Sequence, residues 1–481
     1  MSNERLVFNG INGADGNYLM PPMEPEYFSR FALGGESLDQ QQLKELIWRR
    51  KQTTEIHLGV KEGVNPKNLA ETGWGVIFAH NADPAIREAL SGLLDLRKEQ
   101  ATRKNGRYYQ EFSGISAYRT GESKQEFLAR HGVGPGPADP ELVPYYLLIV
   151  GDPSVIPFRF QYQLDVQYAV GRIHFDKVEE YARYARSVTM AETNNTPRPH
   201  RAVFFGVENP DDKATELSAN ELVKPLASAV AMDQPEWQIE TLVKEDTSKA
   251  RLGQVLGGSQ TPALVFTASH GMGFPNGDGR QLRHQGALLC QDWPGVKAWR
   301  QSIPSSFYFS ADDVGENSQL QGLFAFHFAC YSAGTPRLDD FAHQVNQRGA
   351  VAPQPFIARL PQRLLAHPKG GALAVIGHVE RVWGCSFKWK QTGRQLQVFR
   401  STLKRLMEGH PVGSALEFFN ERYAELSADL SSELEEIKFG KVPDDLALSD
   451  MWTANNDARS YAIIGDPAVR LCLGQSQAAT S

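Results

Sequence analysis

Two residues with the chemistry of acyl transfer each follow an apolar run. His270 closes the run "ALVFTASH", and Cys330 closes the later run "LFAFHFAC". A thiolate attacks a carbonyl carbon, and an imidazole accepts the thiol proton and protonates the leaving amine. The backbone N–H groups of Gly271 and Cys330 are natural donors to the resulting oxyanion. The sequence therefore contains the parts of a Cys–His dyad, with a packing cysteine and a structural histidine as the alternative.

Apolar strands and amphipathic helices alternate along the chain from Trp74 onward. This alternation is typical of an α/β fold whose mostly parallel sheet is flanked by helices. Ligands of such open sheets bind beyond the carboxyl ends of the strands, where His270 and Cys330 are expected to lie. Strands are expected within residues 73–80, 143–153, 201–210, 237–243, 263–271, 322–334, 370–384 and 459–471, and helices within 83–101, 177–188, 211–230, 394–409 and 412–437.

The chain divides into an N-terminal extension and two α/β halves. Residues 1–70 are mixed in character and contain a helix expected to begin at Ser37. The polar stretch 191–200 separates a first half, 71–200, from a second half, 201–475, which holds both residues of the dyad. The acidic stretch "SSELEEIKFGKVPDD" within the second half predicts a mobile bridge.

Composition narrows the function classes. The 481 residues carry a formal net charge of −6 and no long block of Lys and Arg. Nucleic acid and anionic membrane surfaces are therefore not expected as partners. Neither a secretory leader nor a long apolar span is evident, so we expect no membrane insertion and a cytoplasmic location. The 4 cysteines are too scattered for a disulfide framework or a zinc site, and no cofactor is expected.

Several motifs in order resemble a known family. "TASHG" and "FACYSAG" are similar to the His-Gly and Cys motifs of caspase-like cysteine peptidases, a group that includes caspases, gingipains, clostripain, separase and CHAT proteases. The gingipain family resembles the chain most, with CHAT proteases next. The further segments that resemble it are "YYLLIVGDPSVIPFRF", "LDVQYAVGRI", "GGALAVIGHVERVWG" and "RSYAIIGDPAVRL". The resemblance covers roughly residues 70–475 and implies a caspase-hemoglobinase-like α/β fold.

The resemblance also implies residue roles. It assigns the nucleophile to Cys330 and the general acid/base to His270. Asp165 matches the carboxylate that binds a basic P1 side chain in arginine-specific gingipains, and a carboxylate pairs bidentately with a guanidinium. Trp383 matches the aromatic residue that lines the S1 pocket of gingipains. The alternatives are a turn-capping Asp165, or one paired with Arg172, and a core Trp383.

Two further sites are expected near the dyad. Asp152 follows the strand "YYLLIV" and is a candidate to orient His270, since a catalytic base gains from a third group that fixes its tautomer. Stabilisation of its Gly-Asp-Pro turn is the alternative. The Gly- and Asp-rich loop at 273–295 could rim the site or hold calcium, as in some gingipains, although its spacing does not match an EF-hand.

The expected function is that of a cysteine endopeptidase acting through an acyl-enzyme on Cys330. What is known of such enzymes in bacteria implies a dedicated intracellular protein substrate, such as a pore-forming gasdermin, and a role in signalling or antiviral defence. The sequence identifies no activating partner. Two alternatives stay open: a catalytically idle scaffold whose residues 1–70 form the partner surface, and a Cys-dependent acyltransferase or esterase using the same dyad.

Overall fold

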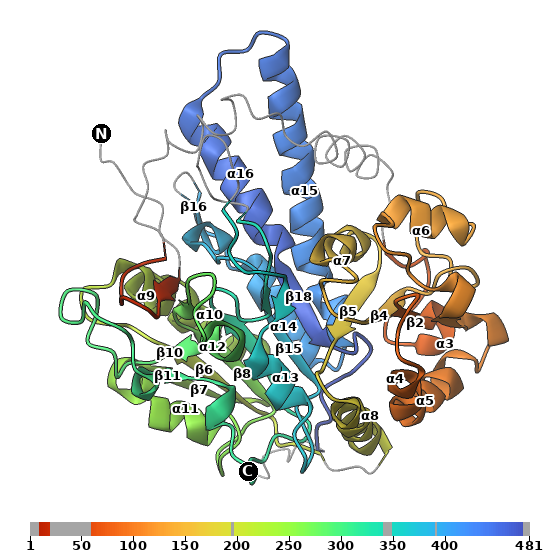
Figure 1. The fold of residues 1–481 in the computed structure, drawn as a ribbon, viewed down its shortest axis with the longest axis horizontal. Helices are drawn as coiled ribbons and strands as arrows, with labels where there is room; N and C mark the ends of the chain where they lie inside the picture. Colours follow the sequence, from red (N-terminus) through yellow and green to blue (C-terminus); the bar gives the residue numbers. More distant parts are fainter. Residues whose placement is uncertain (1–8, 20–58, 194–196, 340–348, 390–391, 475–481) are drawn as a thin grey trace.

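A computed structural model describes most of the chain. The described residues are 9–19, 59–193, 197–339, 349–389 and 392–474. The helix expected from Ser37 lies outside them. The described part is α/β, as predicted, with a large central sheet between layers of helices (Figure 1).

Ten strands form the central sheet. In spatial order they are β3 (Tyr109–Phe112), β2 (Trp74–Phe78), β4 (Tyr146–Val150), β5 (Ala169–Ile173), β18 (Tyr461–Gly465), β15 (Ala374–His378), β12 (Phe324–Phe328), β8 (Leu264–Ala268), β6 (Arg201–Gly206) and β7 (Gln238–Val243). Every residue of β2, β4, β8, β12 and β15 is buried, because helices cover both faces. Their continuous apolar runs are those of strands buried on both faces.

Strand direction divides the sheet into two blocks. The first-half strands and β18 are mutually parallel, and β6, β7, β8, β12 and β15 are mutually parallel. The blocks meet where β18 pairs with β15, and this pairing is antiparallel. The carboxyl ends of β8 and β12 therefore share one edge of the sheet, while β4 ends at the opposite edge.

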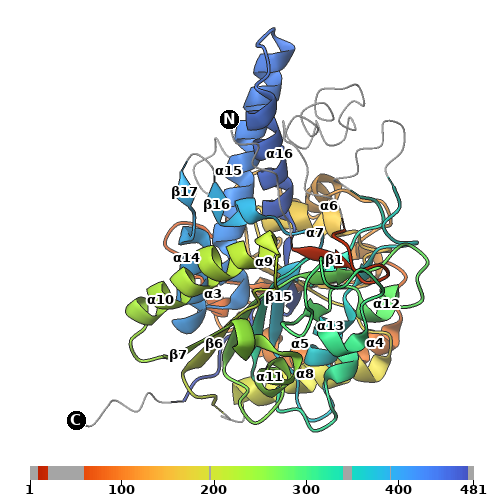
Figure 2. The ribbon, with the colours of Figure 1, turned by 90° about the vertical axis from the view of Figure 1, so that its left-hand side faces the viewer.

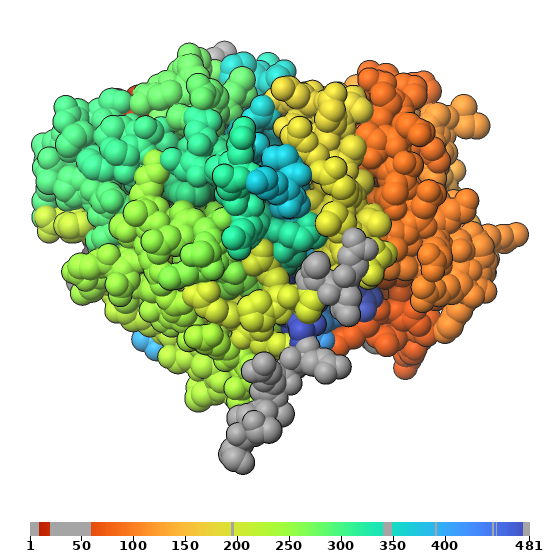
Figure 3. Space-filling model, turned by 90° about the horizontal axis from the view of Figure 1, so that it is seen from below, coloured from red at the N-terminus to blue at the C-terminus, as the bar shows by residue number. Residues whose placement is uncertain are grey.

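The helices form two groups. In one, α4, α5 and α13 pack on α8; in the other, α14 packs on α10 and on α15. From below, the orange residues of the first half and the green residues of the second lie on opposite sides, with yellow residues between them (Figure 3). The helices are α3 (Leu69–Thr72), α4 (Pro84–Ala89), α5 (Ser91–Ala101), α6 (Lys124–Arg130), α7 (Phe158–Asp165), α8 (Val178–Thr193), α9 (Lys213–Leu217), α10 (Lys224–Asp233), α11 (Lys249–Val255), α12 (Gln281–His284), α13 (Arg359–Leu365), α14 (Gln397–Met407), α15 (Val412–Lys438) and α16 (Asp445–Arg459).

Two long helices replace the expected mobile bridge. The acidic stretch continues α15 as far as Lys438, and α16 returns along it. Figure 2 shows the pair standing side by side and projecting above the body. The expected bridge is thus largely helical, because α15 continues beyond its buried Leu426 and Leu430 and packs against α16.

A small second sheet lies beside the carboxyl end of β8. It consists of β1 (Gly10–Asn12), β9 (Gly271–Gly273), β10 (Leu288–Leu289) and β11 (Tyr308–Phe309). β1 comes from the N-terminal extension and pairs in parallel with β9, the strand that follows His270. The extension therefore reaches the end of the sheet where the dyad was expected.

A buried ionic network joins the two halves. Asp466, just after β18, accepts hydrogen bonds from Arg97 Nε at 2.7 Å and from Trp74 Nε1 at 3.0 Å. The remaining nitrogens of the Arg97 guanidinium reach Glu192 at 2.6 and 2.8 Å. The Gly-Asp-Pro turn after β18 is thus bound to α5, α8 and β2.

Glu192→Gln is expected to lower the free energy of unfolding by about 2 kcal/mol at pH 7, because a charged hydrogen-bond pair is lost. Burial acts to raise the pKa of Glu192, but the Arg97 guanidinium holds it below its usual value. The carboxylate thus stabilises the fold above about pH 4.3, its unfolded pKa, and this contribution disappears as the pH falls. Urea unfolding of both proteins at pH 7 and pH 3.5 measures the difference, which should shrink at the lower pH. The exposed Glu99→Gln serves as control, and a difference independent of pH would contradict this account.

Within the residues that the structure describes, no helix combines the length and apolar character needed to cross a bilayer.

Candidate active site

His270 stands two residues beyond the end of β8 and is fully buried. Its Nε2 lies 2.5 Å from Oδ2 of Asp212, and its ring makes edge-to-face contacts with Tyr18 and Trp293. The carboxylate accepts a hydrogen bond from Nε2–H, which leaves Nδ1 of the neutral ring as the acceptor. Among the described residues, that Nδ1 has no hydrogen-bond partner. The ring therefore keeps one nitrogen for proton transfer.

Asp212 holds the imidazole from the start of α9. It is the N-cap of that helix, and its carboxylate accepts hydrogen bonds from the Tyr18 hydroxyl at 2.6 Å and the Thr215 hydroxyl at 2.6 Å. Burial alone would raise the pKa of Asp212, but the charge and hydrogen bond of His270, with the two hydroxyls, hold it well below its ordinary value. The carboxylate is therefore ionised and stabilises an imidazolium.

Asp152, the residue expected to orient His270, lies elsewhere. It follows β4, whose carboxyl end is at the edge of the sheet opposite to that of β8. Its carboxylate contacts His174 Nε2 at 3.1 Å and accepts the N–H of Ser154 at 2.7 Å. The contact with Ser154 fits the alternative role, stabilisation of the turn. The orienting role does not fit, because the order of elements alone does not reveal that β18 and β15 pair in antiparallel fashion.

Cys330 follows β12, beside His270 in the strand order. Tyr331, the next residue, has a φ of 57°, an unfavourable angle for a residue with a large side chain. Burial raises the pKa of the Cys330 thiol, while the Val382 N–H, 3.3 Å from Sγ, and the charge of Arg381 act in the opposite direction. The thiol is thus neutral at rest and needs a base to become a nucleophile.

Gly271 packs directly against the backbone of Cys330. A methyl group at Gly271 would lie 1.8 Å from the carbonyl oxygen of Cys330 and 2.7 Å from its amide nitrogen. Only glycine permits this approach. It brings together the two N–H groups that the sequence predicts as oxyanion donors.

The carbonyl oxygen of Asn9 lies between these two donors. It accepts the N–H of Gly271 at 3.0 Å and the N–H of Cys330 at 3.2 Å. The N–H of Asn9 in turn donates to the carbonyl of Val382 at 3.1 Å. The Asn9 carbonyl thus bridges the two N–H groups that the sequence predicts as oxyanion donors, and the Asn9 N–H pairs with the segment after β15.

Residues 10–19 fix Asn9 in this place. They form a tight turn in which Asn12 N–H donates to Asn17 and Leu19 N–H donates to Gly10. Ile11 is fully buried in a cluster with Met272 and other apolar residues. The Tyr18 hydroxyl adds its bond to Asp212, so the segment is anchored at both its apolar and its polar side chains.

Asp165, assigned by resemblance to the P1 pocket, is a core residue of the first half. It ends α7, and its carboxylate accepts the backbone N–H of Val170. Burial raises its pKa well above the ordinary value, with Arg172 and Lys124 acting only from a distance. The guanidinium of Arg172 donates to Gln161 and to two backbone carbonyls. The structure thus places this carboxyl group in the interior of the first half, with a backbone N–H as its hydrogen-bond donor.

Trp383 lies one residue beyond Val382, the residue that receives Asn9. Its side chain is buried in the main apolar core, and its backbone N–H donates to Asp457 at 2.9 Å. The backbone of this segment thus contacts the bound peptide unit, and the structure places the indole in the core.

The loop at 273–295 rims the small sheet. Asp278 pairs with Arg280 at 2.8 Å, and His284 contacts Tyr308 and Asp312. Within the described ranges, no group of three or more His, Cys, Asp or Glu side chains is arranged to hold a metal ion.

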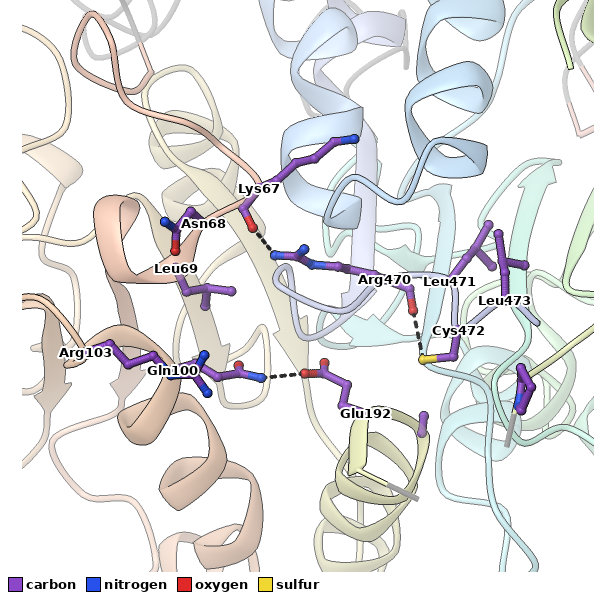
Figure 4. Close-up of a pocket in the computed structure, with 12 residues that line it drawn as sticks. Lys67, Asn68, Leu69, Gln100, Arg103, Glu192, Arg470, Leu471, Cys472 and Leu473 are labelled. Carbon is purple, nitrogen blue, oxygen red and sulfur yellow. Dashed lines mark hydrogen bonds between the residues drawn. The ribbon is translucent and has the colours of Figure 1, made fainter. Parts of the chain in front are cut away.

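A surface pocket of about 510 Å³ lies far from the dyad in sequence and in fold. Figure 4 shows Arg470 in it, donating to the carbonyl of Lys67, and Gln100 donating to Glu192. Neither His270 nor Cys330 lines it.

Asp212 and Asn9 are functional candidates that the sequence does not reveal. The Asp-Asp pair before a helical pattern signals an N-cap at Asp212, but nothing local shows that its carboxylate faces His270. Asn9 belongs to a segment without periodicity, and its role depends on contacts more than 260 residues away along the chain.

Comparisons with known proteins identify the family of the chain. The sequence model of Peptidase family C25 matches residues 138–472, more than half of the chain. A search of curated proteins finds no significant match.

Three solved structures are similar to the chain. The Arg-specific cysteine proteinase gingipain R is 13% identical, with a TM-score of 0.45, covering 86% of this chain and 80% of that one. A structure described only as a protease is 13% identical, with a TM-score of 0.49, covering 83% and 78%. The complex of the Porphyromonas gingivalis RgpB pro- and mature domains is 12% identical, with a TM-score of 0.46, covering 83% and 80%. These likenesses are too distant to assign a role to any residue. The family match confirms the resemblance to gingipains found in the sequence, and the chain belongs to peptidase family C25.

Proposed function

We propose that the protein hydrolyses peptide bonds through a Cys330 acyl-enzyme, with His270 as general acid and base. The observation that carries the proposal is the position of the Asn9 carbonyl oxygen, 3.0 Å from the Gly271 nitrogen and 3.2 Å from the Cys330 nitrogen. Two convergent backbone donors at the nucleophile are the arrangement that stabilises a tetrahedral oxyanion.

The first half-reaction forms the acyl-enzyme. Nδ1 of His270 takes the thiol proton of Cys330, and Sγ attacks the carbonyl carbon of the substrate. The negative charge that develops on oxygen is held by the N–H groups of Gly271 and Cys330. The C–N bond then breaks as His270 returns the proton to the leaving amine.

The second half-reaction releases the acid product. Water gives a proton to Nδ1 of His270 and attacks the thioester carbon through the same oxyanion hole. The S–C bond breaks, and the proton returns to the Cys330 sulfur. Throughout the cycle, Asp212 holds Nε2–H and stabilises the imidazolium formed at each proton transfer.

The substrate backbone is expected to bind as Asn9 does. A P1 residue would donate its N–H to the Val382 carbonyl, as Asn9 does at 3.1 Å. This contact adds a strand segment to the region after β15 and positions the scissile carbonyl independently of the side chain.

Peptidase assays on four full-length proteins test this proposal. A mixture of peptidyl-aminomethylcoumarins covering all P1 residues is the substrate, because it makes no assumption about specificity. Cys330→Ala and His270→Ala are each expected to lose activity by a factor on the order of 10⁴. Cys472→Ala, a thiol in the remote pocket of Figure 4, should retain full activity.

The assay also separates the alternatives left open by the sequence. No turnover by the wild type after prolonged incubation would favour an idle scaffold. Turnover of ester but not amide substrates would favour an esterase or acyltransferase. Amide hydrolysis that survives Cys330→Ala would overturn the assignment of the nucleophile.

A further inference from the structure

The Asn9–Gly10 peptide bond lies at Cys330 in the manner of a scissile bond. We propose that the S1 pocket of this enzyme recognises the carboxamide of asparagine, and that Asn9–Gly10 is the chain's own first cleavage site. The proposal rests on the function proposed above and adds to it the P1 residue and the residues that select it.

The backbone of Asn9 meets each requirement of a P1 residue. Its carbonyl oxygen is held by Gly271 and Cys330, and its N–H by Val382. The following residue, Gly10, is so close to the nucleophile that a methyl group on it would lie 3.0 Å from the Cys330 Sγ. The Asn9 carbonyl group and Gly10 thus both border Cys330, whose thiol is the proposed nucleophile.

The side-chain amide of Asn9 has two neutral oxygen partners. Its Nδ2 donates to the Ser218 hydroxyl oxygen at 3.3 Å and to the Ser269 carbonyl oxygen at 3.3 Å. Asn9 is 3% exposed, and both serines are buried. The Ser218 hydroxyl itself donates to the Thr215 carbonyl at 3.2 Å, so it faces Asn9 as an acceptor.

Two acceptors in this geometry select an amide over an acid. An Asp carboxylate would place its oxygen against the Ser269 carbonyl, which cannot donate, and a buried unpaired charge is costly. A basic P1 side chain would meet only these two neutral oxygens, where it needs a carboxylate to balance its charge. Discrimination by buried hydrogen-bonding groups is strong because a wrong side chain leaves them unpaired.

The backbone around Ser218 is built to present its hydroxyl. Ser218–Val223 form a π-helical segment between α9 and α10, and such segments are frequent at functional sites. The π-helical segment directly follows α9, whose N-cap Asp212 contacts His270. The P1 contact and the catalytic base are therefore fixed by one short stretch of chain.

Cleavage of the Asn9–Gly10 bond follows the same two half-reactions. Sγ of Cys330 bonds to the Asn9 carbonyl carbon, and the bond to the Gly10 nitrogen breaks as that nitrogen takes the proton from His270. Water then hydrolyses the thioester, leaving a carboxylic acid on Asn9 and a free amine on Gly10. Departure of residues 1–9 leaves the oxyanion donors and the S1 pocket open to another substrate.

Self-cleavage is tested on the full chain. Wild-type protein is incubated at pH 7.5 and followed by intact mass and N-terminal sequencing. The expected product begins at Gly10, and it should be absent from Cys330→Ala and at least about 100-fold slower in Asn9→Asp. Cleavage at Gly10 that persists in Cys330→Ala, through spontaneous Asn-Gly chemistry or another protease, would overturn the proposal, as would a wild-type chain that stays intact.

Specificity in trans is tested on the processed enzyme with acetyl-Val-Phe-X-aminomethylcoumarin, where X is Asn, Asp, Ala or Arg. Asn is expected to exceed Asp and Arg in kcat/KM by about 100-fold. Ser218→Ala should reduce the ratio of kcat/KM for Asn over Ala about tenfold, as the loss of one hydrogen bond to P1 implies. Ser228→Ala, the same change on the exposed part of α10, should leave that ratio unchanged.

The outcomes separate this inference from the function on which it rests. Cys330-dependent hydrolysis with a preferred P1 residue other than Asn would overturn the asparagine pocket and leave the peptidase intact. Loss of all hydrolysis, including that of the mixed-P1 substrates, would overturn both. A Ser218→Ala enzyme that slows on Asn and Ala substrates alike would assign Ser218 a merely structural role and contradict the proposal.

Discussion

Gly271→Ala is expected to reduce kcat/KM by more than 10³-fold while the protein remains folded. The added methyl group would lie 1.8 Å from the Cys330 carbonyl oxygen and 2.7 Å from its carbonyl carbon and amide nitrogen. The atoms that clash with the methyl group belong to the Cys330 backbone and cannot rotate away as a side chain would. The backbone of β9 and that of Cys330 must therefore move apart. Loss of a single oxyanion donor costs 10²–10³-fold in comparable enzymes, and this change displaces both donors together with the nucleophile.

Gly279→Ala is the matched control for this prediction. It lies in the loop that follows β9, and a methyl group there would meet no atom within 4 Å. Circular dichroism and thermal unfolding of both variants should resemble those of the wild type, apart from a modest loss of stability in Gly271→Ala from overpacking. A folded Gly271→Ala enzyme with near-normal activity would refute the proposed oxyanion hole.

Asp212→Asn is expected to lower kcat by 10²- to 10⁴-fold with a smaller change in KM. Asparagine caps a helix as well as aspartate does, so α9 should be preserved. The charge that supports the imidazolium is lost, and the amide can donate to Nε2, which would place the ring proton on Nδ1, the nitrogen needed as base. Steady-state kinetics on a peptidyl-aminomethylcoumarin provide the measurement.

Asp152→Asn tests the same question from the other candidate carboxylate. Asp152 pairs with His174 at the opposite edge of the sheet, so the activity of the Asp152→Asn enzyme should stay within a few-fold of the wild type.

The pKa of Asp212 is well below its ordinary value, so its carboxylate stays ionised in mild acid and should cause no loss of activity above about pH 4. Equal defects in Asp152→Asn and Asp212→Asn would contradict the assignment of Asp212.

The general fold could be predicted because its strands are locally encoded. The apolar runs that became β2, β4, β8, β12 and β15 are buried on both faces, and their shortness and flanking turn residues favour strands over buried helices. What could not be predicted is the direction of β18. Its sequence resembles that of β4, and both turns use the Asp side chain to accept an N–H two residues on. Only the antiparallel pairing with β15 reveals that the sheet has two blocks.

The candidate site could be predicted where its signals are local. His270 and Cys330 follow strands that lie side by side, and Gly271 packs against the backbone of Cys330. Asp165 resembled a pocket residue by order of motifs, but the chain folds it into the core of the first half. Asp212, Ser218 and Asn9 act through contacts between elements distant in sequence, which periodicity and spacing do not encode.

Active-site labelling tests the central claim most directly. Wild-type protein is produced as the full chain and incubated at pH 7.5 so that it can process itself. It is then treated with acetyl-Val-Phe-Asn acyloxymethyl ketone, a peptide electrophile that reacts selectively with thiols. Tandem mass spectrometry identifies the modified residue. One label per chain on Cys330, lost in His270→Ala and retained in Cys472→Ala, is the predicted result. Labelling of another cysteine, equal labelling of Cys330 without His270, or no labelling of the native protein would contradict the proposed dyad.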